Sequence, residues 1–139
     1  MNGPLKEWIG KAEEDYRTAL RMSRYRRDPT PSTICFHCQQ CVEKYLKACA
    51  VRLGQPVLHI HHLERLLDAI VPLLPALQAQ RNDLLTINPF GVAPRYPGFI
   101  LDMKDAAEAV AAMKRVRLVL RQVIGIKRTS ARRRRKRSK

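Results

Sequence analysis

The sequence predicts an all-α protein: an up-and-down bundle of four to five helices with a disordered basic C-terminal tail. Apolar residues recur at intervals of three and four, which is the helical period. Alternating β-branched runs typical of strands are missing. The 139 residues are enough for one domain with a single core. We therefore expect a helical domain over residues 1–126 and a tail over 127–139.

The first helix is expected over residues 4–27. Pro4 suits the first turn of a helix, and the Asp-Pro-Thr-Pro sequence at 28–31 ends it. The apolar positions expected to face the core are Leu5, Trp8, Ile9, Ala12, Tyr16, Ala19 and Leu20 or Met22.

The second helix is expected over residues 34–53 and forms the centre of the bundle. Ser32 or Thr33 can cap its start, and Gly54 favours its end. The chain's four cysteines share one apolar arc of this helix: Cys35, Cys38, Cys41 and Cys49. Their C-x2-C-x2-C spacing also occurs in iron–sulfur sites, but those sites wrap a loop around the cluster. A continuous helix instead favours buried core cysteines, with no metal bound.

The second half of the chain contains shorter elements and one long helix. We expect a third helix over 61–70, a short fourth over 76–86 and a final helix over 102–124. Three prolines and two glycines predict a loop over 87–98.

The positive charge is concentrated at the C-terminus. The chain has 27 Lys and Arg against 12 Asp and Glu, a formal net charge of +15. Nine of the basic residues lie in 127–139, which leaves a net charge of +6 for the rest. Such a segment repels itself, has nothing to bury and attracts nucleic-acid phosphate; a solvated end or a targeting signal is the alternative. Its densest run is Arg132, Arg133, Arg134, Arg135, Lys136 and Arg137.

Polar side chains gather on the side of the second helix opposite the cysteines: His37, Gln40, Lys44 and Lys47. One interpretation is a solvated face, with Glu43 and Lys47 as an ordinary surface ion pair. The other is a phosphate-binding groove that Arg95 completes from the 87–98 loop. The two interpretations differ in whether Arg95 points inward.

Three histidines precede the third helix: His59, His61 and His62. They are too few to complete a metal site, although one could act in general acid–base chemistry.

No apolar run reaches the roughly 20 residues of a membrane span, and the N-terminus lacks the order of a secretory signal. We therefore expect a cytoplasmic protein without membrane attachment.

Several motifs occur in an order typical of one family. Trp8-x3-Ala12-x2-Asp15-x3-Ala19 is followed by Gln-Gln-x2-Glu-Lys-x2-Lys over 39–47, then His61-His62-Leu63, then Arg-Tyr-Pro-Gly over 95–98. Over roughly residues 5–124 the chain resembles the HEPN family, the higher eukaryotes and prokaryotes nucleotide-binding domain. Here Ile-His-His-Leu stands in place of the family's Thr-His-Asp-Leu-like turn, and the cysteines and the basic tail are additions.

The resemblance implies an all-α bundle, a homodimer and a nucleotide- or RNA-related role, often beside a nucleotidyltransferase in a toxin–antitoxin-like pair. A homodimer through the long helices is also plausible from the pattern of the helices themselves. Many members are ribonucleases that use an Arg followed after four to six residues by a His. The last histidine here is His62, so that motif is absent from its expected place. Arg52 and His59 match the spacing, but Gly54 and Pro56 lie between them.

The leading hypothesis is a non-catalytic domain that binds nucleotide or RNA phosphate and works with a partner nucleotidyltransferase, without a cofactor. Lys44, Lys47 and Arg95 would hold phosphate oxygens, and Tyr96 would stack on a base or ribose. Directional hydrogen bonds would come from His37, Gln40 and His61. The alternatives are a metal-independent endoribonuclease toxin that uses Arg52 and His59, and a protein-interaction module whose tail alone touches nucleic acid.

Overall fold

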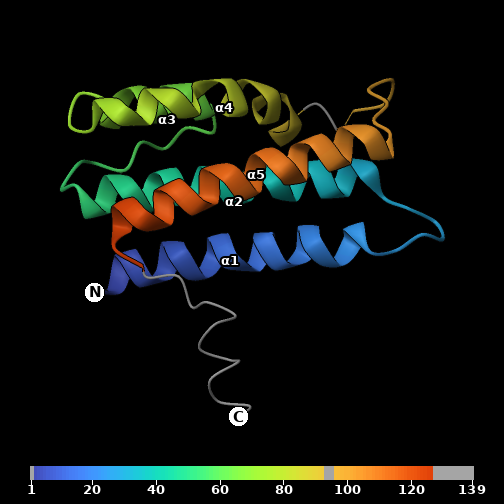
Figure 1. The fold of residues 1–139 in the computed structure, drawn as a ribbon, viewed down its shortest axis with the longest axis horizontal. Coiled ribbons are helices and arrows are strands. Elements are labelled where there is room, and N and C mark those ends of the chain that lie inside the picture. Colours follow the sequence, from blue (N-terminus) through green and yellow to red (C-terminus); the bar gives the residue numbers. More distant parts are fainter. Residues whose placement is uncertain (1, 93–95, 127–139) are drawn as a thin grey trace, which may run out of the picture.

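The computed structural model describes residues 2–92 and 96–126, and within these ranges the chain is all-α, as predicted (Figure 1). The α-helices are α1 (Gly3–Ser23), α2 (Pro31–Arg52), α3 (Leu63–Ile70), α4 (Arg81–Ile87) and α5 (Met103–Ile124). Two 3₁₀ helices flank α4: η1 (Pro75–Gln80) and η2 (Asn88–Gly91). The predicted tail over 127–139 and Arg95 lie outside the described residues.

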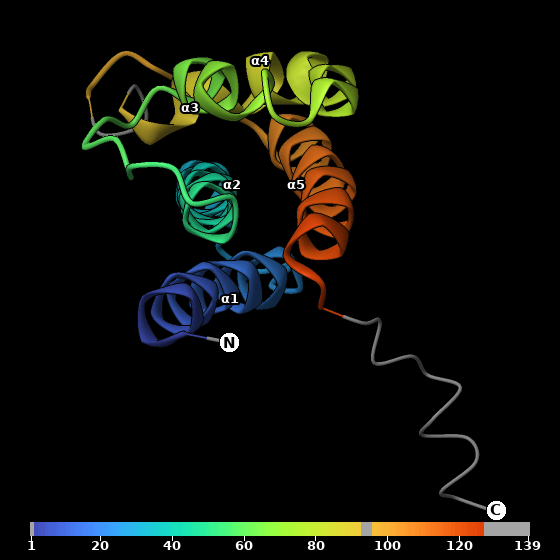
Figure 2. The same ribbon diagram turned by 90° about the vertical axis from the view of Figure 1, so that its left-hand side faces the viewer.

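The central position predicted for the second helix is confirmed, because α2 contacts α1, α3, η2 and α5. Viewed along the bundle, α1 lies on one side of α2, α5 lies beside it, and α3 and α4 cover the opposite side (Figure 2). The chain direction of α1 opposes that of both α2 and α5 (Figure 1). The two longest helices, α2 and α5, therefore run in the same direction, and α3, η1 and α4 connect them.

Helix α1 is shorter than predicted. Its start is capped by Asn2, whose side chain accepts a hydrogen bond of 2.7 Å from the Leu5 backbone. The helix ends at Ser23 instead of residue 27. Residues 24–29 are exposed and bury no apolar face, so packing does not stabilise a further turn. Asp28 then adopts a left-handed backbone with a φ of 49°.

Helix α2 begins earlier than predicted, and neither Ser32 nor Thr33 caps it. The helix starts at Pro31, with Thr30 at the N-cap position and no side-chain cap. Proline suits this place because its missing N–H would lack a helical partner in any case. The end at Arg52 agrees with the prediction to one residue, and Gly54 follows with a φ of 71°.

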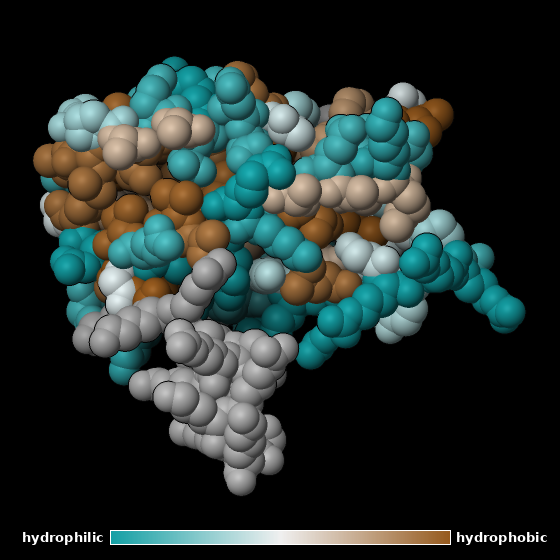
Figure 3. Space-filling model, in the orientation of Figure 1, coloured by the Kyte–Doolittle hydropathy of each residue, from teal (hydrophilic) through white to brown (hydrophobic). Residues whose placement is uncertain are grey.

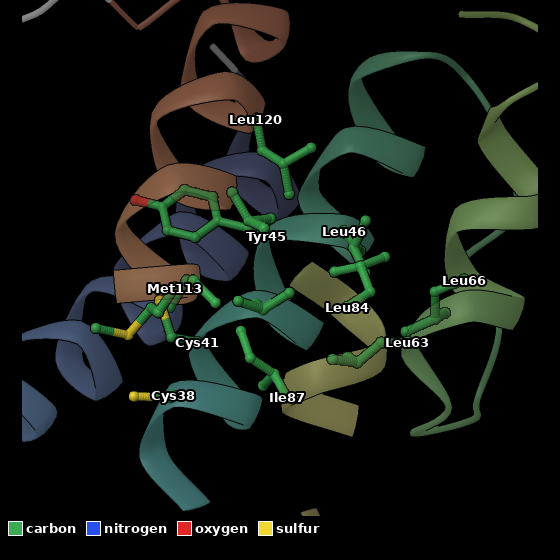
Figure 4. Close-up of a cluster of buried hydrophobic side chains, with 14 of the residues drawn as sticks. Cys38, Cys41, Tyr45, Leu46, Leu63, Leu66, Leu84, Ile87, Met113 and Leu120 are labelled. Atoms are coloured by element: carbon green, nitrogen blue, oxygen red, sulfur yellow. The ribbon is translucent and has the colours of Figure 1, made fainter. Parts of the chain in front are cut away.

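The prediction that the cysteines belong to the core is confirmed, since all four are fully buried. Of the 22 residues of α2, 13 are buried, including side chains that meet α3, α4 and α5 (Figure 4). The apolar positions predicted for the first helix also pack as expected. Leu5, Ala12 and Ala19 are buried, and the partly buried ones are Trp8, Ile9, Tyr16, Leu20 and Met22.

The later elements follow the predicted order with local differences. Helix α3 begins at Leu63, two residues later than predicted, and His62 caps it. The predicted fourth helix divides into η1 and α4, and the predicted loop contains η2. Asp102 and Asp105 form a reciprocal capping box at the start of α5, and Gly125 ends that helix with a φ of 90°. None of the helices in the described ranges combines the length and apolar character that a membrane span requires.

Candidate functional site

The polar edge of α2, defined as His37, Gln40, Lys44 and Lys47, is held by two carboxylates that the sequence-based site did not include. Asp15 of α1 contacts the side chains of His37 and Lys44. Glu43 of α2 contacts Lys47 and also His61 from the segment before α3. The predicted ligands therefore form two clusters, each built around one acid.

The first cluster joins α1 to α2. The His37 Nδ1 lies 2.8 Å from one oxygen of Asp15, and the Lys44 ammonium donates to the other oxygen. Burial alone would raise the pKa of Asp15, but the hydrogen bonds and charges of His37 and Lys44 outweigh it, so the pKa lies below its ordinary value. Asp15 is therefore an anion that accepts from His37 Nδ1. This hydrogen bond fixes the ring, and about a quarter of each of the His37 and Lys44 side chains is exposed.

The second cluster lies deeper in the molecule. Lys47 donates to Glu43 over 3.1 Å, and their side chains are only 7% and 4% exposed. This is the i,i+4 pair that one interpretation placed on a solvated surface, and the structure overturns that placement. The Lys47 ammonium also lies 5.5 Å from the centre of the Trp8 ring. By contrast, the His61 side chain is 73% exposed, although its Nδ1 lies 3.0 Å from Glu43.

Gln39 connects this cluster to the segment that follows α4. Its amide donates to the His61 carbonyl over 3.0 Å and to Glu43 over 3.3 Å, and its oxygen accepts from Gln40 over 2.7 Å. Gly91 of η2 packs so closely that a Cβ there would lie 2.7 Å from the Gln39 Cδ. The end of η2 is thereby held against α2, immediately before the segment that contains Arg95 and Tyr96.

The predicted site residues are brought together only in part. His37 meets Lys44 at Asp15, and Lys47 meets His61 at Glu43, while Gln40 bonds to its neighbour Gln39. Tyr96 is 63% exposed. Whether Arg95 points inward is a question that falls outside the described residues.

Sequence reasoning missed Asp15, Gln39, Glu43 and Gly91 as site residues. One available signal was the stripe of Gln39, Glu43 and Lys47 at successive intervals of four. Polar residues on an otherwise apolar central helix must find partners when they are buried. No such signal in the local sequence marks Gly91, because its role depends on the approach of a distant helix.

A third carboxylate network joins α1, α2 and α5 and has a structural role. Glu13 accepts two hydrogen bonds from Arg117, of 2.8 and 2.6 Å, and one from the Tyr45 hydroxyl. Arg121 donates to the same hydroxyl over 2.9 Å. Burial acts to raise the pKa of Glu13, but these donors lower it below its ordinary value. The Arg117 guanidinium also stacks 3.9 Å from the centre of the Tyr16 ring.

Arg52 and His59, the weak candidates for catalysis, are both exposed. Within the described ranges, no hydrogen bond or ion pair joins them. Arg52 lines a cavity of about 390 Å³ with Asn2, Leu5, Val51 and Ile124, but His59 is not part of its lining. A turn at Leu53 and Gly54 and a segment without regular secondary structure lie between the two residues in the chain.

The four cysteines are protonated thiols at neutral pH. Burial raises the pKa of Cys35 and of Cys49 to about 12, and it raises the pKa of Cys38 and Cys41 as well. Metal binding requires the thiolate, which this environment disfavours. Across residues 2–92 and 96–126, no three His, Cys, Asp or Glu side chains are grouped so that they could hold a metal ion.

Comparison with known protein families finds a match over the whole helical bundle. The profile of the HEPN domain matches residues 5–123, which extend from the first turn of α1 to the last turn of α5. No curated protein and no solved structure matches the chain. The profile covers all the helices that build the two clusters at the polar edge of α2. The chain belongs to the HEPN domain family.

Proposed function

We propose that this HEPN domain binds the phosphate groups of a nucleotide or RNA at the polar edge of α2, without cleaving them. In this proposal it acts as a homodimer beside a partner nucleotidyltransferase, in a toxin–antitoxin-like pair. Membership of a family with nucleotide- and RNA-related functions supports the class of ligand. The observation that carries the location is the cluster at Asp15, where an imidazole and an ammonium are held side by side, each with about a quarter of its side chain exposed.

The predicted ligands have distinct roles in this proposal, and Gln40 supplies a directional hydrogen bond beside its contact with Gln39. Lys44 and Arg95 hold phosphate oxygens, the Nε2 atoms of His37 and His61 accept hydrogen bonds from ribose hydroxyls, and Tyr96 stacks on a base. Lys47 does not contact the phosphate in this proposal, because its ammonium is buried. It pairs with Glu43, which also contacts His61. Asp15 competes with the phosphate for Lys44, so we expect modest affinity.

The test is equilibrium titration of a fluorescent ATP analogue onto the full chain. The Lys44→Ala variant should bind about 10-fold more weakly, because a hydrogen bond to a charged group contributes roughly 1.5–3 kcal/mol. Lys44→Arg should retain binding, and Lys6→Ala, an exposed lysine at the start of α1, is the matched control. Equal affinity of Lys44→Ala and the parent chain, with both folded by circular dichroism, would exclude this edge as the site.

A gel of the RNA recovered from the same type of titration separates binding from cleavage. Intact RNA agrees with the proposal. Fragments that disappear on His59→Ala substitution would instead establish the endoribonuclease alternative. RNA binding that is lost only when the six basic residues of 132–137 are replaced by serine would assign nucleic-acid contact to the tail.

A further inference from the structure

The basic side chains of the bundle divide into those with acidic partners and those without. Ion pairs engage Lys44, Lys47, Arg81, Arg115, Arg117 and Arg121. None of the ion pairs in the described ranges involves the arginines between Tyr16 and Asp28. We call this group, together with the tyrosine among them, the α1 ridge: Arg17, Arg21, Arg24, Tyr25, Arg26 and Arg27.

The α1 ridge is a continuous surface. Arg17, Arg21 and Arg24 are spaced by four and three residues, which places them in one stripe along α1. Arg26 and Arg27 follow in the connection to α2. All five arginines are exposed, and the Tyr25 side chain between them is 61% exposed. Hydrophilic side chains project at the right-hand end of the molecule in Figure 3, where Figure 1 places this connection.

Acidic residues lie at the two ends of the ridge but do not neutralise it. Glu14 precedes Arg17 by one turn, and Asp28 follows Arg27. Neither forms an ion pair with a ridge arginine. Between Asp15 and Glu43 the sequence contains five arginines and a single acid, Asp28. The ridge therefore carries a net positive charge, and no ion pair in the described ranges engages its arginines.

The last turns of α1, which carry the first ridge arginines, pack against the core. Ala19 is buried, and the partly buried Leu20 and Met22 pack against the core. Pro29 and Pro31 restrict the backbone just beyond Arg27. Arg17 and Arg21 are thus displayed from a helix that packs on the core, and Arg24, Arg26 and Arg27 follow its last residue, Ser23.

We infer that the α1 ridge is a second nucleic-acid surface, which binds the phosphate backbone of single-stranded RNA while Tyr25 stacks on an unpaired base. Unpaired arginines beside an exposed aromatic ring are the combination that single-strand binding uses. Base-paired RNA would leave Tyr25 without a stacking partner. An anionic membrane fits less well, since the apolar face of α1 is packed in the core and is not free to insert.

This inference goes beyond the proposed function and does not require the polar edge of α2 to bind anything. The two surfaces lie on different elements, one on α2 and the other on α1 and the connection that follows it. A mononucleotide tests the polar edge of α2, whereas only a strand of several nucleotides spans the ridge. Their failures are therefore distinguishable in one set of proteins.

The experiment measures fluorescence anisotropy of a labelled uridine oligomer of about 16 nucleotides with the full chain, from about 0.05 to 0.2 M salt. The ridge variant is Arg21→Gln with Arg24→Gln and Arg26→Gln. The control variant removes the same charge from exposed sites elsewhere: Lys6→Gln, Lys11→Gln and Arg65→Gln. Each protein is also titrated with the ATP analogue and with vesicles of phosphatidylcholine and phosphatidylserine.

Each lost phosphate contact lowers the slope of log affinity against log salt by about 0.7 for a single strand, so the ridge variant should lose about 2 in slope. Its RNA affinity should fall at least about 10-fold at 0.1 M salt, with ATP binding unchanged. Tyr25→Ala should weaken binding roughly 5-fold or more without changing the slope, and Tyr25→Phe should restore it.

Three results would overturn the inference. The first is an unchanged affinity and slope in the ridge variant. The second is an equal loss in the control variant, which would show dependence on net charge alone. The third is a ridge variant that loses vesicle binding but keeps RNA binding, which would assign the surface to a lipid headgroup.

Discussion

The polar edge of α2 and the α1 ridge are both rich in basic side chains, but they differ in how that charge is used. At the edge, Asp15 and Glu43 hold the two lysines, and Lys47 is almost fully buried. On the ridge, five arginines stand in solvent without acidic partners. The comparison teaches that formal charge indicates a binding surface only where the structure leaves it uncompensated. At the edge, much of the charge stabilises the contacts among α1, α2 and the segment before α3.

The largest expected effect is on the buried pair at the edge. Glu43→Ala leaves the Lys47 ammonium buried without its carboxylate, and Gln39 and His61 also lose a partner. Removing one member of a buried ion pair costs about 3 kcal/mol in the free energy of unfolding. Urea denaturation followed by circular dichroism measures it, with the exposed Glu14→Ala as a control that should change stability by less than about 0.5 kcal/mol.

Replacing both partners sharpens this result. Glu43→Leu with Lys47→Met removes the buried charges together, so stability should recover most of the loss. If Glu43→Ala alone were as mild as Glu14→Ala, the edge would be an ordinary solvated face after all.

A smaller effect is expected from pH. The pKa of Asp15 and that of Glu13 lie below their ordinary values of 3.8 and 4.5, since hydrogen-bonded cations stabilise the charged forms. The stability from each is fully present above its ordinary pKa and is lost as pH falls through the lower pKa of the folded state. Urea midpoints should therefore decrease below about pH 4.5. Asp15→Asn should flatten part of this decrease, and an identical acid profile in that variant would contradict the assignment.

The smallest effect on stability is expected at the ridge. Arg21→Gln with Arg24→Gln and Arg26→Gln removes no contact found in the structure and relieves repulsion between neighbouring turns of α1. The free energy of unfolding should stay within about 0.5 kcal/mol of the parent, with any change toward higher stability. A loss above 1.4 kcal/mol, the equivalent of tenfold in the folding equilibrium, would mean that these arginines are structural.

The helical order was predictable because each long helix is amphipathic and proline, glycine or a capping residue marks at least one of its ends. Pro31 and Gly54 enclose α2, and Asp102 and Gly125 enclose α5. The end of α1 was placed four residues too late, since a helical pattern alone does not show where packing stops. The buried cysteines were also predictable, because their thiols share an arc with apolar neighbours in a continuous helix.

The site was less predictable than the fold. His37, Lys44, Lys47 and His61 were identified as a group, but their division between Asp15 and Glu43 depends on how α1 and the segment before α3 dock on α2. The ridge arginines are spaced by four and three in the sequence, but this spacing does not show whether acidic side chains pair with them. Only the partners found in the structure separate ridge arginines from Arg115, Arg117 and Arg121.

The sequence by itself determined that this chain is an all-α bundle of the HEPN type, since periodicity, capping residues and motif order are local properties of the chain. The tertiary structure alone decided which charges are compensated and which remain available. An ion pair depends on the distance between side chains far apart in sequence, such as Glu13 and Arg117 or Asp15 and Lys44. That distance is set by helix packing, and no count of acidic and basic residues contains it.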